Sequence, residues 1–178
     1  NKCSIALEFL ARGIAGHIED KHWGKYMGNR DCGKGVFGEI TQTALEKYTT
    51  TINASHFLAD RTVGEGDKAK KNSWMIPLQF VRIALTQEMK FDNENRGMKI
   101  DGVTIKMFAS GGDIIEGRQN YQNEMYFTLA CRIIFMCNDT PPIKPVDTLE
   151  SCVSFQSTKQ FKSQSWIDAE EKMMIGQG

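Results

Sequence analysis

The sequence has no excess of charge of either sign. Its 178 residues include 22 basic and 22 acidic side chains, so the formal net charge is zero. This balance excludes a histone-like protein or a polybasic tail, because such proteins attract phosphate through a large net positive field. Any surface that binds nucleic acid must therefore be local. The length is that of one globular domain with a proper core.

Long apolar runs are also missing. The longest runs, such as 133–137, are far shorter than the roughly 20 residues that cross a bilayer. No charged segment followed by an apolar one opens the chain, so we expect neither a membrane span nor export. The chain starts at Asn1 and has helical character by Ile5, from which we expect a fragment of a longer protein.

Paired cysteines are absent as well. The five cysteines are odd in number and include no CxxC pair. This pattern argues against a disulfide framework and against a structural zinc site. We therefore expect a reducing intracellular compartment.

Hydrophobic spacing predicts the elements of the first third of the chain. Leu7, Leu10, Ile14 and Ile18 recur at helical intervals, which predicts a helix over about 3–17. The segments 23–27 and 49–52 are predicted to be strands. A second helix is predicted between these strands from five residues at helical spacing: Val36, Phe37, Ile40, Ala44 and Tyr48.

Two later apolar runs, 81–85 and 132–137, are typical of strands covered on both faces of a parallel sheet. The polar segment 59–73 predicts a surface loop, and 74–80 a short helix. The glycine-rich, mixed-charge segment from about 92 to 125 has the character of an insertion outside the core. Together these elements predict an α/β fold with a central, mainly parallel sheet flanked by helices.

A glycine-rich motif, GxxxxGK, lies between the first predicted strand and the second helix. Backbone N–H groups of such a loop cradle phosphates, the helix N-terminus adds positive potential, and the lysine reaches the outer phosphates. The alternative interpretation is a tight strand-to-helix turn with an exposed lysine. The motif predicts a nucleotide-binding loop made of Gly28, Asn29, Arg30, Asp31, Cys32, Gly33, Lys34, Gly35 and Val36.

One position departs from the usual motif. Gly35 follows the lysine, where Ser or Thr usually holds Mg²⁺ with its hydroxyl. The next hydroxyl of the predicted helix, Thr41, is nearly two turns away and cannot reach the metal. The motif therefore supports nucleotide binding more strongly than fast hydrolysis.

Both later strands lead to polar residues that suit an NTPase. The strand 81–85 leads to Glu88, a carboxylate for the neighbourhood of the metal and the attacking water. The strand 132–137 leads to Asn138, whose amide can orient water or touch a γ-phosphate. Gln87 stands where stricter motifs carry a first carboxylate, so both usual protein contacts to Mg²⁺ are altered.

In this order, the motifs resemble those of the superfamily 3 helicases, specifically the primase-helicases of large DNA viruses and related phage and plasmid replication proteins. The most specific part is 106–118, which is similar to the element K-x-x-x-[ST]-G-G-D-x-x-x-x-R. The resemblance extends from the helix before the glycine-rich loop to about Phe155. It implies an AAA+-type ATPase domain over 1–178, a fragment of a longer replication protein, that assembles into a ring, usually a hexamer.

The resemblance also implies roles in ATP chemistry. Gly28, Gly33 and Lys34 would bind the ATP phosphates. Glu88 would activate water and serve Mg²⁺, through a water molecule where direct contact is not made. Asn138 would sense the γ-phosphate. Lys34, Glu88 and Asn138 are thus the implied catalytic residues, with ATP and Mg²⁺ as cofactors.

Contact with DNA would fall to the insertion. By the resemblance, Lys106, Asp113 and Arg118 would face the central channel and couple nucleotide state to single-stranded DNA. A few basic residues repeated around a ring make a positive channel without making each subunit basic. In the family that the chain resembles, the segment after the strand that corresponds to 132–137 commonly carries an arginine that reaches a neighbouring subunit's ATP. The segment 145–155 contains none, so this arginine is unassigned, and Arg132 or Arg118 would be a guess.

The leading hypothesis is an ATP-dependent replicative DNA helicase that forms a homo-oligomeric ring and translocates on single-stranded DNA. Replication proteins or a linked primase domain are the expected partners, and the host cytoplasm or nucleus is the expected compartment if the protein is viral. The alternative is an AAA+ nucleotide-binding assembly or DNA-binding module with weak or no ATP hydrolysis, favoured by Gly35 and Gln87. A small-molecule P-loop kinase is disfavoured because no acceptor-binding lid is apparent.

Overall fold

Five parallel strands form the central sheet of the computed structural model, which describes residues 2–59, 68–87 and 99–162. The strands are adjacent in the order β2-β3-β7-β1-β9, and each of these pairings is parallel. The predicted strands 23–27, 49–52 and 132–137 are confirmed, whereas the strand predicted over 81–85 starts later and extends by one residue. The strands are β1 (Trp23–Met27), β2 (Thr49–Ile52), β3 (Ile83–Thr86), β7 (Arg132–Cys137) and β9 (Cys152–Gln156).

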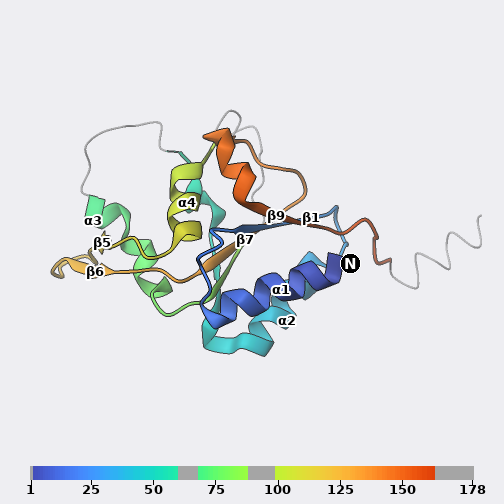
Figure 1. Cartoon of the computed structure of the whole chain (residues 1–178), viewed down its shortest axis with the longest axis horizontal. Coiled ribbons are helices and arrows are strands. Elements are labelled where there is room, and N and C mark those ends of the chain that lie inside the picture. The colour runs from blue at the N-terminus through green and yellow to red at the C-terminus, as the bar shows by residue number, and fades with distance from the viewer. Residues whose placement is uncertain (1, 60–67, 88–98, 163–178) are drawn as a thin grey trace, which may run out of the picture.

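Strand β7 lies between β1 and β3 in the sheet, although it follows both in the sequence. The chain between β3 and β7 includes a helix and a hairpin outside the sheet (Figure 1). Because all five strands are parallel, their carboxyl ends meet at one edge. Ligands of open α/β sheets bind at this edge, where the strand order reverses. The glycine-rich loop and Asn138 both leave the sheet there.

Helices α1 (Lys2–Ala15) and α2 (Lys34–Leu45) cover one face of the sheet (Figure 1). Phe9 of α1 packs edge-on against the ring of Phe155, with 5.5 Å between the ring centroids. Helix α1 is confirmed, but Leu7 is exposed and the larger Phe9 occupies the core position. The buried stripe therefore differs from the predicted one. The buried core of this face consists of Phe9, Ile83, Leu85, Ile134 and Phe155.

Helix α2 turns a different side to the sheet from the one that its hydrophobic spacing predicts. Phe37 packs against the core of this face, but Val36 and Ile40 are 58% and 62% exposed. Gly38 is buried, and a Cβ there would lie 3.5 Å from Met136. A small residue at this point lets the helix lie close to the strands. The spacing predicts the helix correctly and its buried side wrongly, because a small residue faces the sheet.

Helix α4 (Gly102–Ser110) covers the opposite face, together with short 3₁₀ helices (Figure 1). The ring centroid of Phe57 lies 5.0 Å from that of Phe135 and 5.7 Å from that of Phe108. Ile105, Phe108 and Ala109 of α4 are buried. The prediction that 92–125 lies outside the core is therefore wrong for α4, whose few apolar residues fall on one side of a helix. The 3₁₀ helices are η1 (Glu46–Tyr48), η2 (Ala54–Phe57), η3 (Ser73–Leu78) and η4 (Val146–Ser151).

Two smaller sheets lie beside the central one. Strands β5 (Ile115–Gly117) and β6 (Met125–Phe127) form an antiparallel hairpin, and β4 (Ile100–Asp101) pairs in parallel with β8 (Ile143–Lys144). Helix α3 (Lys68–Lys71) lies next to the hairpin (Figure 1).

The predicted surface loop is described only in part, since 60–67 lie outside the described residues and 68–71 form α3. The predicted helix over 74–80 is the 3₁₀ helix η3. Within the three described ranges, the helices are too short or too polar for a membrane span.

Candidate functional site

The glycine-rich loop connects the end of β1 to the start of α2. Gly33 has a φ of 92°, in the left-handed region that favours glycine. The N–H of Phe37 donates to the carbonyl oxygen of Gly33 at 2.9 Å and begins the helix. The N–H of Gly28 donates to the carbonyl oxygen of Cys137 at 3.3 Å, and a Cβ at Gly28 would clash with the sulfur of Cys32. Local geometry thus requires both glycines.

The lysine of the motif is buried beneath the loop. Lys34 is 9% exposed. Its Nζ donates to the carbonyl oxygen of Gly28, to that of Asn29 at 3.4 Å, and to Oδ1 of Asn138 at 2.5 Å. The interpretation of a turn with an exposed lysine is therefore wrong. These three partners are carbonyl oxygens of the backbone and of an amide side chain, and they place the ammonium at the edge of the loop.

A cavity of about 1030 Å³ opens over the loop. It is large enough for a small-molecule ligand such as a nucleotide. Eight of the nine predicted loop residues line it, and Gly28 instead lines a neighbouring cavity of about 530 Å³. The sequence therefore predicts one wall of the cavity well. The lining comprises 29–36, Met136, Cys137, Asn138, Asp139 and Phe161.

The predicted acidic residue, Glu88, lies outside the described residues. Strand β3 ends at Thr86, and the N–H of Gln87 donates to the carbonyl oxygen of Ile52 at 3.0 Å. Gln87 and Asn138 follow adjacent strands and leave the sheet at the same edge. The role of Glu88 stays a prediction.

The described residues offer few ligands to Mg²⁺. Gly35 has no side chain, and the hydroxyl of Thr41 donates to the carbonyl oxygen of Phe37 at 2.7 Å. Asp31 and Asp139 line the cavity, but in the described ranges no three His, Cys, Asp or Glu side chains gather as a metal site would require. Mg²⁺ commonly takes its ligands from water and substrate phosphates as well as from carboxylates. These residues fit the phosphates of a nucleotide and do not by themselves fit a metal held by protein.

A segment after β9, residues 157–161, lies against the loop, and we name it the strap. The N–H of Phe161 donates to the carbonyl oxygen of Asp31 at 2.7 Å. The side-chain Nε2 of Gln160 donates to the carbonyl oxygen of Arg30 at 3.0 Å. Sequence reasoning missed the strap because these contacts use backbone groups and one isolated side chain, which leave no spacing pattern.

The three residues predicted to contact DNA have separate surroundings. Lys106 of α4 forms an ion pair with Asp147 at 2.7 Å. Asp113 is exposed in the loop after α4. Arg118 follows β5, and its guanidinium lies 4.0 Å from a carboxylate oxygen of Glu124. Their part in DNA binding stays a prediction.

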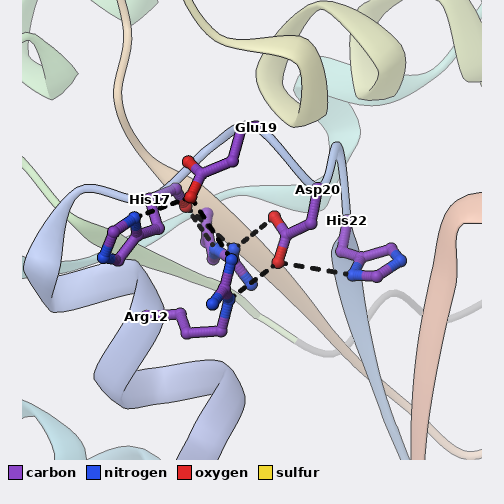
Figure 2. Close-up of polar contacts among 6 residues, drawn as sticks. Arg12, His17, Glu19, Asp20 and His22 are labelled. Atoms are coloured by element: carbon purple, nitrogen blue, oxygen red, sulfur yellow. Dashed lines mark hydrogen bonds and ion pairs between the residues drawn. The ribbon is translucent and has the colours of Figure 1, made fainter.

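Arg132 belongs to a structural network at the other end of β7. It is 3% exposed. Its guanidinium donates to Asp20 at 2.5 Å and to the carbonyl oxygen of His17 at 2.8 and 3.1 Å. The guanidinium also lies 4.8 Å from the ring centroid of Phe9. Figure 2 shows Arg12 reaching the same carboxylate. This burial removes Arg132 as a candidate for contact with a neighbouring subunit's ATP.

The two arginines also change the pKa of Asp20. Burial raises the pKa of this carboxyl, but the hydrogen bonds and charges of Arg132 and Arg12 outweigh burial and lower it to about 2. The carboxylate is therefore ionised at neutral pH and links α1 to β7.

Comparison with known proteins identifies a viral relative. The chain is 33% identical over 138 residues to "Putative helicase V13" of Sputnik virophage. The match covers 78% of this chain and 17% of the virophage protein, so the chain spans less than a fifth of that relative. No protein-family model matches the chain.

Solved structures share the fold. The apo C-terminal region of NrS-1, residues 305–718, has a TM-score of 0.56 at 16% identity, over 88% of this chain and 36% of that chain. The JCV helicase, solved with a bound acetamide compound, has a TM-score of 0.53 at 12% identity, over 88% of this chain and 41% of that chain. These similarities confirm the predicted α/β core with its mainly parallel sheet.

Proposed function

We propose that the chain, which is similar to the virophage protein "Putative helicase V13" and shares its fold with the JCV helicase, is the ATPase domain of an ATP-dependent replicative DNA helicase of the superfamily 3 type. In this proposal the protein forms a homo-oligomeric ring, a hexamer, that translocates on single-stranded DNA inside the infected host cell. We assign 1–178 to one such domain of a longer replication protein. A linked primase domain or other replication proteins are its proposed partners.

The observation that carries the proposal is the position of Lys34 between the loop and Asn138. Its ammonium lies within hydrogen-bonding distance of both sides of the cavity. A triphosphate over the loop would accept hydrogen bonds from backbone N–H groups and from this ammonium. Asn138 would then contact the γ-phosphate and report its presence to β7. Mg²⁺ would arrive with the ATP and neutralise phosphate charge, and Glu88 is proposed to activate the attacking water.

The hairpin and the loops next to it are the proposed DNA contact. Lys106 and Arg118, on the part of the chain between β3 and β7, would exchange their exposed carboxylate partners for DNA phosphates, and Asp113 would orient a neighbouring basic side chain. Tyr121, in the turn between β5 and β6, is fully exposed. An exposed aromatic ring can stack on a base of single-stranded DNA, and such stacking tolerates any sequence. These residues would line the channel of the ring.

A second candidate function is a nucleotide-binding assembly module that hydrolyses ATP weakly or not at all. It is favoured by Gly35, which removes the usual hydroxyl ligand of Mg²⁺, and by Thr41, whose hydroxyl is bonded within α2. Such a module would bind ATP and form the same assembly without acting as a motor.

The test is ATP turnover with and without single-stranded DNA. We expect DNA to stimulate turnover and Lys34→Ala to abolish it, because the phosphates lose their buried cation. Lys47→Ala is the matched control, since Lys47 is exposed near the far end of α2 and should not matter. ATP turnover that does not change when single-stranded DNA is added would contradict a motor that translocates on DNA. Normal ATP affinity without turnover, even with DNA present, would favour the second candidate.

A further inference from the structure

Phe161 is an exposed aromatic residue at the nucleotide cavity. Its ring is 72% exposed and lines the cavity over the loop. The flat faces of aromatic rings suit stacking on another ring system. The motifs of the phosphate loop give this ring no role, because it lies beyond β9.

The backbone holds the ring in place. The Phe161 N–H bonds to the carbonyl oxygen of Asp31 at 2.7 Å, and the Ser157 N–H bonds to that of Met27 at 2.9 Å. The strap is thus tied to the residue before the phosphate loop and to the middle of the loop. The ring itself lies over Gly33, where an added Cβ would approach the ring at 3.2 Å. A backbone anchored in this way has little conformational freedom to lose when a ligand binds to its side chain.

Val36 provides a second exposed apolar side chain at the same cavity. It lies in the first turn of α2 and is 58% exposed. The remaining exposed lining side chains are polar or charged, among them Asn29, Arg30 and Asp139. The cavity therefore combines a phosphate-binding part, formed by the loop and Lys34, with an apolar part formed by Phe161 and Val36.

We propose that Phe161 is the base-stacking residue of the nucleotide site, with Val36 as the second apolar contact to the nucleobase. The proposal rests on the proposed function, because it assumes that the loop holds the phosphates of the same nucleotide. The occupant is a nucleoside triphosphate whose base stacks on the Phe161 ring, and purines stack better than pyrimidines because their ring system is larger. The strap couples the base to the loop through the carbonyl oxygens of Arg30 and Asp31.

The experiment compares ATP with inorganic tripolyphosphate, which carries the phosphates without a base. Dissociation constants of both ligands are measured by calorimetry on the full chain. Wild type should bind ATP more tightly than tripolyphosphate. Phe161→Ala should weaken ATP binding about fivefold or more and leave tripolyphosphate binding within about twofold, since base–aromatic stacking contributes at least about 1 kcal/mol. The alanine variant keeps the backbone hydrogen bond, so only the ring is removed.

Two further variants complete the design. Phe161→Trp should keep ATP affinity within about twofold of wild type, because indole also stacks on bases. Phe80→Ala is the matched control, since Phe80 is 79% exposed and does not line the cavity. It should bind both ligands as wild type does.

Unchanged or tighter ATP binding by Phe161→Ala would overturn the proposal, as would an equal loss for both ligands, which would assign the ring to support of the loop. If wild type binds tripolyphosphate and ATP equally, the proposed base-stacking site is wrong, whereas the proposed phosphate site is supported. If wild type binds neither ligand, the proposed function fails as well.

Discussion

A buried cation lies at each end of strand β7, and the two have different roles: one supports the fold and the other lies at the cavity. At the first residue of the strand, Arg132 is 3% exposed and its charge is matched by the carboxylate of Asp20. After its last residue, Asn138 accepts a hydrogen bond from Lys34, which is 9% exposed and lines an open cavity. Burial therefore does not distinguish a structural cation from one poised for a ligand. The surroundings do, because the guanidinium of Arg132 is enclosed by a carboxylate, a carbonyl oxygen and an aromatic ring, whereas Lys34 lines a cavity that can admit an anion.

Arg132→Gln should produce the largest effect on stability. It removes the buried partner of Asp20 and the contact with Phe9, and we expect the free energy of unfolding to fall by about 3 kcal/mol. Chemical denaturation measures this quantity. The matched control is Arg12→Gln, which removes the half-exposed arginine that bonds to the same carboxylate and should cost less than about 1 kcal/mol. An equal loss in the free energy of unfolding for the two variants would show that burial of Arg132 has no special structural role.

Asn138→Ala should have the complementary effect at the other end of the strand. Asn138 is exposed, so the free energy of unfolding should change by less than about 0.5 kcal/mol. ATP turnover should fall about 100-fold, because the γ-phosphate loses a positioned hydrogen-bond partner in the transition state. Steady-state ATP hydrolysis and denaturation on the same preparation separate the two effects. A large loss of stability with unchanged turnover would assign Asn138 to the fold instead.

The contrast also explains how much of the molecule the sequence could predict. Strand 132–137 was predictable because a continuous apolar run is a local property. The loop and Lys34 were predictable because backbone cradling of phosphate needs glycines at fixed spacing. The partner of Arg132 was not, since Asp20 lies 112 residues away in the sequence. No local sequence pattern predicts an ion pair between residues so far apart in the chain.

Two errors have the same origin in long-range contacts. Helix α4 was expected outside the core because glycines and charges around it mask the apolar side chains of Ile105 and Phe108, which need a distant aromatic cluster to be buried. The ring of Phe161 was missed because its N–H bonds to Asp31, far back in the chain. Sequence patterns predict elements and local motifs, whereas the assignment of buried faces depends on contacts between distant segments.

Gly35→Ser tests the cavity end of β7 by adding a functional group, where the other variants remove one. A Cβ at Gly35 would meet no atom within 4 Å, so serine fits without rearrangement. The added hydroxyl would supply the usual protein ligand of Mg²⁺, and we expect ATP turnover to rise about tenfold. Gly35→Ala is the control, because it gives a gain in helix propensity at least as large as that of serine, about 1 kcal/mol, without a hydroxyl. If alanine raises turnover as much as serine, the effect belongs to the helix and the metal is not involved.

The smallest expected effect is the pH dependence of the stability that Asp20 contributes beside Arg132. Asp20 has a pKa of about 2 in the folded protein, below the ordinary value of 3.8 for this carboxyl. The folded state therefore holds this proton less tightly than the unfolded state, so the stabilisation is complete above about pH 4 and is lost as the pH falls toward 2. Since the carboxylate is partly exposed to solvent, we expect this contribution to be about 1 kcal/mol. Denaturation of wild type and Asp20→Asn between pH 5 and about pH 2.5 measures it: the difference in stability between the two should shrink as the pH falls. A constant difference across this range would mean that the carbonyl oxygen of His17 and the ring of Phe9 stabilise the buried Arg132. The carboxylate of Asp20 would then not be what distinguishes the Arg132 end of β7 from the end at the cavity.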